Sequence, residues 1–129
     1  MWESYGEEVQ FYVVYIREAH ALDSAVPLGG NIDRTFGGGM NPLMEDPVTF
    51  AERQSAAATC ATKLALEPMP MLVDDMLDTA NNAFYAWPER LYLIGADGKV
   101  AYTGEPGPGG FDPDGLEKAI NAELDALSE

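Results

Sequence analysis

One run of apolar residues limits the fold more than any other feature of the chain. Residues Val9 to Ile16 (VQFYVVYI) are β-branched and aromatic with almost no polar interruption. A strand with one solvent face would alternate apolar and polar residues, so an unbroken run of this length is typical of a strand buried on both faces of a parallel sheet. The run therefore predicts a central strand in an α/β domain.

A segment rich in glycine and proline follows this strand. Between Arg17 and Pro47 the chain has neither helical nor strand periodicity, and it contains Gly29-Gly30 and the run Gly37 to Gly39. This composition predicts a long loop. A loop of about 30 residues is uncommon in a compact domain and is usually functional or disordered.

A helix is predicted next. Thr49 and Glu52 form a T-x-x-E capping box, and the residues from Phe50 to Leu66 are rich in helix formers. Pro68 and Pro70 are expected to end the helix. Its apolar residues recur at helical spacing and are expected to face the core: Ala57, Cys60, Ala61 and Leu64.

A short strand and a second helix come after these prolines. Met71 to Val73 is the predicted strand. Asp78 or Thr79 can cap a helix that runs to Trp87, where Pro88 stops it.

The remaining residues predict a hairpin and a terminal helix. Arg90 to Ile94 and Lys99 to Thr103 are two strands, and the Asp97-Gly98 step between them suits the positive φ of a tight turn. A last helix is predicted from Pro113 to Leu127, opened by Asp112. Its apolar face consists of Leu116, Ile120, Leu124 and Leu127.

This succession of elements resembles the second half of a thioredoxin-type domain, which has a helix ended by X-Pro, an antiparallel hairpin and a terminal amphipathic helix. In that fold the proline before the hairpin is commonly cis and lies beside the redox site. Pro88 occupies this place, so we expect a cis Trp87-Pro88 bond; a trans proline that merely stops the helix is the alternative. We expect residues 1–129 to form a single domain.

The charge of the chain excludes two classes of partner. Seven Lys and Arg residues against 22 Asp and Glu residues give a formal net charge of -15. A surface this acidic repels a phosphate backbone and an anionic membrane, so we expect neither nucleic acid nor a membrane as a partner. The acidic excess also serves as a solubilising surface and says little about the substrate.

The single cysteine, Cys60, limits redox and metal chemistry. It cannot form an internal disulfide, and its place on the apolar face of a helix predicts a packing thiol rather than a catalytic one. With one cysteine and one histidine we expect no zinc site, and no cofactor is predicted. Asp74, Asp75 and Asp78 are expected to cap the following helix, with weak cation binding as the alternative.

The first residues (MWESYGEEV) lack the pattern of a signal peptide, in which basic residues precede an apolar stretch. The chain also has no run of about 18 apolar residues. We expect a cytoplasmic protein, unless a targeting segment precedes Met1.

Three stretches of sequence point to one family among the proteins with a thioredoxin-type fold. They are Tyr15 to His20 (YIREAH) at the end of the predicted central strand, Pro88 to Ile94 (PERLYLI) and Tyr102 to Pro108 (YTGEPGP). In this order and at compatible spacing they resemble the iodothyronine deiodinase family, including its bacterial members. The resemblance runs from about Tyr5 to Leu124.

The resemblance implies an oxidoreductase that carries out reductive dehalogenation of an aromatic iodide such as thyroxine. Its partners would be a small-molecule substrate and a thiol electron donor, and a homodimer is left open. In that family a selenocysteine, or a cysteine in many bacterial members, lies on the loop after the first strand and attacks the halogen.

The resemblance also implies which residues form the site. Tyr15, Glu18 and His20 would form a proton-delivery network with His20 closest to the chemistry, since a histidine can hold or release a proton at neutral pH. Arg90, beside Pro88, would contact a substrate carboxylate. For His20 the alternative is a loop histidine with no catalytic role. For Arg90 the alternative is a strand arginine that forms an ion pair with the nearby carboxylate of Glu89 or Asp97.

The nucleophile of that family has no counterpart in this sequence. The family pattern places a further β-α unit before Val9, and Met1 to Gly6 resembles only the last turn of its helix. We therefore expect a thioredoxin-like domain that is truncated at the N-terminus and inactive as it stands. Two other functions stay open: a peroxiredoxin-like or thiol-disulfide oxidoreductase, and a non-catalytic thioredoxin-fold binding module.

Overall fold

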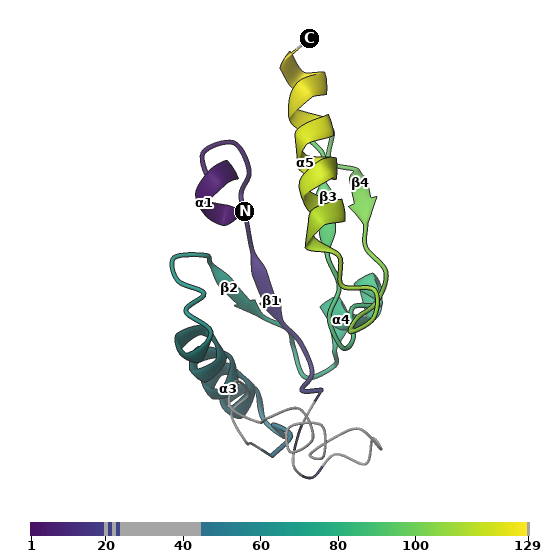
Figure 1. Cartoon of the computed structure of the whole chain (residues 1–129). Coiled ribbons are helices and arrows are strands. Elements are labelled where there is room, and N and C mark those ends of the chain that lie inside the picture. Colours follow the sequence, from purple (N-terminus) through teal and green to yellow (C-terminus); the bar gives the residue numbers. More distant parts are fainter. Residues whose placement is uncertain (20, 22, 24–44, 129) are drawn as a thin grey trace. The chain divides into compact units, whose positions relative to one another are not determined.

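The computed structural model describes residues 1–19, 21, 23 and 45–128 (Figure 1). The chain divides into two compact units, one of residues 11–82 and one of residues 1–10 and 83–129. We describe each unit by itself. Both combine helices with a small sheet, so the predicted mixture of α and β structure is confirmed, while the single domain stays a prediction.

The unit of residues 11–82 contains two parallel strands. β1 (Val13–Tyr15) pairs with β2 (Met71–Val73) in a register that places Val13 opposite Met71 and Tyr15 opposite Val73. The predicted strand at Met71 to Val73 is confirmed. The predicted strand at Val9 to Ile16 is shorter than expected, because only its residues 13–15 are in β structure.

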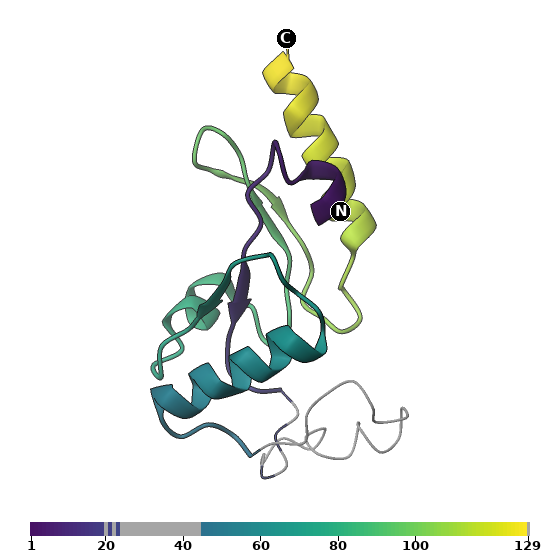
Figure 2. The same ribbon diagram turned by 90° about the vertical axis from the view of Figure 1, so that its left-hand side faces the viewer.

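The expected burial of β1 on both faces is wrong. Val14 is 43% exposed and its partner Leu72 is 50% exposed, whereas Val13 and Tyr15 are half-buried. Neighbouring residues of a strand point to opposite faces, so the described residues of this unit cover one face of the sheet and leave the other exposed. The helix α3 (Phe50–Lys63) packs against β2 (Figure 2).

The predicted capping box starts α3. The Thr49 hydroxyl accepts a hydrogen bond from the Glu52 amide at 3.2 Å, and the Glu52 carboxylate accepts from the amides of Thr49 at 3.0 Å and Val48 at 2.9 Å. These bonds satisfy amides that a helix N-terminus leaves without intrahelical partners.

The buried face of α3 differs from the predicted one. The buried residues are Arg53, Ala56 and Ala57, while Leu64 lies after the helix and is 42% exposed. Cys60 is half-buried. The buried face therefore begins about one turn earlier in the helix than predicted. The periodicity of apolar residues could not show this, because it does not assign a charged arginine to the core side.

The end of α3 is set by the backbone rather than by proline. Ala65 has φ +50°, its amide donates to the Thr62 carbonyl at 3.3 Å, and the Leu66 amide donates to the Ala61 carbonyl at 3.0 Å. This pair of bonds is a Schellman motif, which usually has glycine at the left-handed position. The helix thus ends at Lys63, before Pro68 and Pro70.

The unit of residues 1–10 and 83–129 contains the predicted hairpin. β3 (Tyr92–Ile94) pairs antiparallel with β4 (Val100–Thr103), with a register shift after Leu93. In the turn, Gly98 has φ +78° and the Gly95 amide donates to the Lys99 carbonyl at 2.8 Å. The tight Asp97-Gly98 turn is therefore confirmed.

The helix α5 (Pro113–Ser128) packs on both strands of this hairpin. Asp112 caps it, since its carboxylate accepts from the Gly115 amide at 2.9 Å. Leu116 and Ile120 are buried as predicted, but Leu127 is 63% exposed. The short helix α1 (Trp2–Tyr5) contacts α5 through the Tyr5 hydroxyl, which lies 3.1 Å from an oxygen of Glu117 and of Asn121.

The chain passes from one unit to the other within α4 (Thr79–Phe84). This helix ends at Phe84, earlier than the predicted Trp87, and the next residue, Tyr85, has φ +47°. The Trp87-Pro88 peptide bond is cis, as predicted. None of the helices in the described part of the chain is long and apolar enough to cross a membrane.

The left-handed residue after α3 gives a stability prediction. We expect Ala65→Gly to raise the free energy of unfolding by about 0.5 to 1 kcal/mol, because glycine removes the Cβ strain of a positive φ at some cost in chain entropy. Ala58→Gly, at an exposed position inside α3, is the matched control and should lower it by about 1 kcal/mol. Urea unfolding followed by circular dichroism measures both, and a neutral or destabilising Ala65→Gly would contradict the strain.

Candidate functional site

Two predicted site residues meet at the carboxyl end of β1. The Tyr15 hydroxyl donates a hydrogen bond to the Glu18 carboxylate, whose other oxygen accepts from the Ala19 amide at 3.2 Å. Both side chains are half-buried. The third predicted member of the network, His20, lies outside the described residues.

The surroundings of Tyr15 keep its phenol protonated. Burial raises the pKa of Tyr15 far above its usual range, and the hydrogen bond to Glu18 and the charge of that carboxylate raise it further. The phenol is therefore a hydrogen-bond donor at any physiological pH. The pair consists of one neutral donor and one carboxylate, which can orient and stabilise a protonated group beside it.

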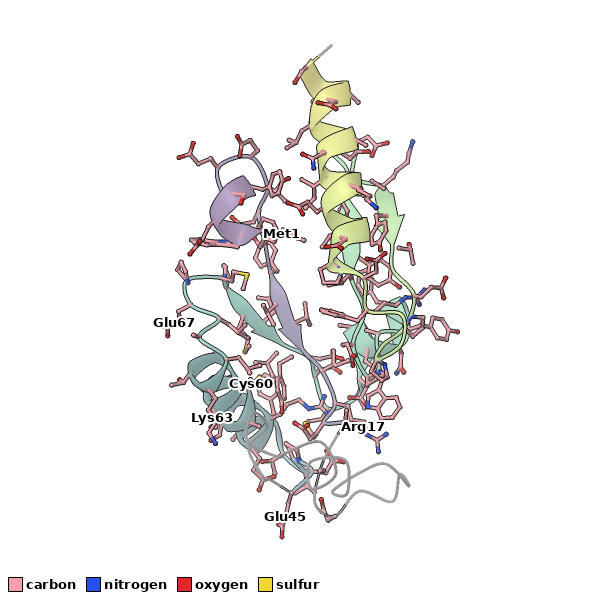
Figure 3. All side chains as sticks on the ribbon, in the orientation of Figure 1. Met1, Arg17, Glu45, Cys60, Lys63 and Glu67 are labelled. Atoms are coloured by element: carbon pink, nitrogen blue, oxygen red, sulfur yellow. The ribbon has the colours of Figure 1, made fainter. Side chains whose placement is uncertain are left out.

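The only thiol of the chain shares this environment. Cys60 lies on α3, and Figure 3 shows it on the side of the helix that faces the strands. Burial raises the pKa of the Cys60 thiol, and the charge of Glu18 raises it further. A thiol with a raised pKa is a poor nucleophile at neutral pH, because the thiolate is the reactive form. Its half-buried position is more open than the predicted packing role implied.

A buried arginine joins α3 to the turn after β2, and the sequence analysis missed it. Arg53 is 3% exposed. Its Nη1 donates to the carbonyl of Asp75, lies 3.5 Å from the carbonyl of Asp74 and donates to the Asp78 carboxylate at 2.9 Å. The sequence contains one sign that Arg53 faces the core. Arg53 lies seven residues before Cys60, so the two share a helix face.

Two of the three aspartates of this turn, Asp74 and Asp75, act as caps, as expected, whereas the Asp78 carboxylate accepts from Arg53 instead. The Asp74 carboxylate is 5% exposed and accepts from the amides of Asp75, Ala80 and Asn81 at 2.8 to 2.9 Å. The Asp75 carboxylate accepts from the Thr79 hydroxyl at 2.7 Å and from the Thr79 amide at 3.2 Å, and these bonds lower the pKa of Asp75. Their oxygens thus hold the start of α4.

Arg90 and Pro88 belong to the other unit. The Arg90 guanidinium donates from Nε to the Gly104 carbonyl at 2.6 Å. It lies 3.5 Å from the carbonyl of Phe84, the last residue of α4, and 3.4 Å from that of Tyr85, the residue after it. It also lies 5.4 Å from the centre of the Tyr92 ring. Arg90 therefore caps the C-terminal end of α4.

The expected alternative partners of Arg90 are not observed. Among the described residues, the ion pair of Asp97 is with Lys99 at 3.4 Å, and Glu89 forms none with Arg90. Arg90 and Pro88 lie in one unit and Tyr15 and Glu18 in the other, so the implication that all of them form one site stays a prediction.

The single thiol allows a test of the site's electrostatics. We expect the pH dependence of Cys60 alkylation by iodoacetamide to give a thiol pKa above the ordinary value. Glu18→Gln should lower this pKa, because a nearby negative charge is lost. At pH 7.5 the variant should therefore react faster. Glu67→Gln, an exposed carboxylate beyond α3 (Figure 3), changes the net charge equally and serves as the control. Equal pKa values in the Glu18 variant and the parent would show that Glu18 does not act on the thiol.

Comparison with known proteins agrees with the family resemblance noted in the sequence. The sequence profile of the iodothyronine deiodinase family matches residues 1–123. Thyroxine 5-deiodinase from sheep (Ovis aries) is 32% identical over 108 residues, which cover 83% of this chain and 32% of the sheep protein.

The human and pig enzymes are similarly related. Thyroxine 5-deiodinase from human (Homo sapiens) is 32% identical and that from pig (Sus scrofa) is 31% identical, each over 83% of this chain and 31% of the relative. The chain thus spans about a third of the length of these relatives. Because the family profile covers nearly all of its residues, the chain belongs to the iodothyronine deiodinase family.

Proposed function

We propose that this chain is the thioredoxin-type part of a reductive deiodinase, which replaces the iodine of an aromatic iodide such as thyroxine by hydrogen. The observation that carries the proposal is the Tyr15–Glu18 hydrogen bond at the carboxyl end of β1, in a member of this family. In open α/β sheets, ligands bind beyond the carboxyl ends of the strands, which is where this pair lies.

The order of the elements supports the thioredoxin-type fold. A parallel strand pair with α3 is followed along the chain by α4, the antiparallel hairpin β3–β4 and the terminal helix α5. This is the succession that the sequence predicted for such a domain.

The reaction divides into two steps. A thiolate or selenolate attacks the iodine, the carbon–iodine bond breaks, and the carbon takes up a proton while a sulfenyl or selenenyl iodide forms. One thiol of the donor then displaces iodide and forms a mixed disulfide or selenenyl sulfide. A second donor thiol releases the reduced nucleophile, and the two donor thiols leave as a disulfide. The nucleophile is proposed to come from outside residues 1–129, because the raised pKa of Cys60 keeps it in the thiol form.

The residues of this chain are proposed to handle the proton. His20 would give it to the ring carbon, and the negative charge of Glu18 would favour the protonated imidazole. Tyr15 would orient Glu18 through its hydrogen bond. Arg90 would bind the carboxylate of an amino-acid-like substrate with the part of its guanidinium that the Gly104 and α4 carbonyls do not use.

The first prediction concerns the 129-residue chain by itself. We expect no reductive dehalogenase or peroxidase activity with dithiothreitol as the donor, because its only thiol is held protonated in the half-buried site. Iodide release from thyroxine and consumption of hydrogen peroxide measure the two activities. Turnover that disappears in Cys60→Ser would overturn the assignment of Cys60 as a non-catalytic thiol.

The second prediction concerns the longer protein that supplies a nucleophile to this chain. His20→Ala should lower the rate of iodide release by about 10² or more, which is the usual contribution of a general acid or base. Tyr15→Phe and Glu18→Gln, which act through this proton donor, should lower the rate by less. Glu67→Gln is the matched control and should leave the rate unchanged, since this carboxylate is exposed. Absence of iodide release in the longer protein would refute the proposed function, and unchanged rates in the two variants would refute the role of the pair.

A further inference from the structure

The chain contains two Asp-Gly steps, Asp97-Gly98 in the turn between β3 and β4 and Asp114-Gly115 in the first turn of α5. An aspartate followed by glycine can isomerise without an enzyme. The glycine amide nitrogen bonds to the side-chain carboxyl carbon, water leaves, and a cyclic succinimide forms. Water then opens the ring at either carbonyl, and opening at the main-chain carbonyl gives isoaspartate. Glycine permits the attack because it has no Cβ to obstruct the approach.

The Asp97 carboxylate is folded over the peptide bond that this reaction uses. Its Oδ1 accepts a hydrogen bond from the Lys99 amide at 2.9 Å, and its Oδ2 lies 3.4 Å from the Lys99 ammonium. A side-chain oxygen that accepts from the amide two residues further on forms an Asx turn. Because Gly98 lies between the two bonded groups, its nitrogen is held close to the Asp97 carboxyl carbon.

Little opposes the rotation of the Gly98 peptide that ring closure requires. The Asp97 side chain is 60% exposed. Apart from the chain neighbours of Gly98, no described atom lies within 4 Å of the place that a Cβ on this glycine would take. The Gly98 amide donates to the Gly95 carbonyl at 2.9 Å. Ring closure therefore breaks a hydrogen bond at the tip of an exposed turn, where local opening is least costly.

The Asp114-Gly115 step, in contrast, is part of the cap of α5. The Gly115 amide donates to Oδ1 of Asp112 at 2.9 Å. A Cβ on Gly115 would lie 2.4 Å from Oδ2 of the same carboxylate and 2.8 Å from the Tyr102 hydroxyl. Rotation of this peptide would break the cap in a crowded place, so the start of the helix protects its own Asp-Gly step.

We propose that Asp97 is a modification site at which isoaspartate forms spontaneously in the folded protein, while Asp114 is protected. Water is the only co-reactant, since one molecule leaves when the ring closes and one enters when it opens, and nothing is oxidised or reduced. The site lies within the unit of residues 1–10 and 83–129 and does not rest on the proposed function.

Isoaspartate in this turn changes the hairpin as well as the residue. The main chain then runs through the former side chain of Asp97 and is longer by one carbon. Across the same turn, the Gly95 amide donates to the Lys99 carbonyl at 2.8 Å. The register of a hairpin is fixed by the type and length of its turn, so the extra atom disturbs the pairing of β3 with β4. Because α5 packs on both strands, the modified unit is less stable.

Trypsin separates the two sites, because cleavage after Arg90, Lys99 and Lys118 places them in the peptides of residues 91–99 and 100–118. The folded 129-residue chain is incubated at neutral pH and body temperature. The isoaspartate content of each peptide is then measured by reversed-phase chromatography against synthetic isoaspartyl standards. Isoaspartate should form at Asp97 about tenfold or more faster than at Asp114, where a helix cap must first be lost.

Two controls show whether the fold makes the difference. In the chain unfolded by urea both Asp-Gly steps are exposed, so their rates should become similar. Asp97→Glu keeps the charge but would have to close a larger ring, so the peptide of residues 91–99 should stay unmodified in this variant. Similar rates at the two sites in the folded chain, faster reaction at Asp114, or isoaspartate at Asp97 only in the unfolded chain would each overturn the proposal.

The effect on the hairpin has its own measurement. The chain that carries isoaspartate at position 97 is isolated by ion-exchange chromatography and unfolded with urea beside the unmodified chain. Its midpoint should lie at a lower urea concentration, because the turn no longer fits the register of β3 and β4. Equal midpoints would refute the effect on the hairpin.

Discussion

The buried guanidinium of Arg53 is the contact on which the unit of residues 11–82 depends. It joins α3 to the turn that ends β2 and begins α4, through two backbone carbonyls and the Asp78 carboxylate. Removing Arg53 would leave two backbone carbonyls and the half-buried Asp78 carboxylate without their donor, at a cost of about 1 to 3 kcal/mol for each buried acceptor. Since a domain is stable by only about 5 to 15 kcal/mol in total, this side chain contributes substantially to the stability of the unit.

The same turn fixes the end of β1, where the candidate site lies. The Asp74 amide donates to the Tyr15 carbonyl at 2.9 Å, and the Asp74 carboxylate caps α4. Arg53 is therefore linked to the backbone of Tyr15 through Asp74, whose carbonyl lies near the guanidinium and whose amide donates to Tyr15. The small side chains of Ala56 and Ala57, next on the buried face of α3, leave room for the helix to approach the sheet closely. The scaffold and the candidate site are thus held by one set of contacts.

Signals confined to a few neighbouring residues predicted the fold well, and signals that depend on distant packing did not. The capping box of α3 and the Asp97-Gly98 turn appear as expected because each is a local backbone arrangement with its own residue signature. The positive φ of Ala65 has no such signature, and the exposure of Val14 depends on which face of the sheet is covered. The Tyr15–Glu18 pair was predicted from the family resemblance, whereas Arg53 was missed because a charged residue breaks the apolar pattern.

The electrostatics of the site limit what its residues can contribute to a reaction. Burial and the charge of Glu18 raise the pKa of the Tyr15 phenol and of the Cys60 thiol alike, so at neutral pH both groups keep their protons. An environment that disfavours a second negative charge cannot generate a thiolate, but it favours a positive charge beside the carboxylate. Such an environment suits a proton donor and not a nucleophile. This asymmetry is the physical reason why the proposed reaction gives the proton transfer to this chain and the attack on iodine to a group from outside it.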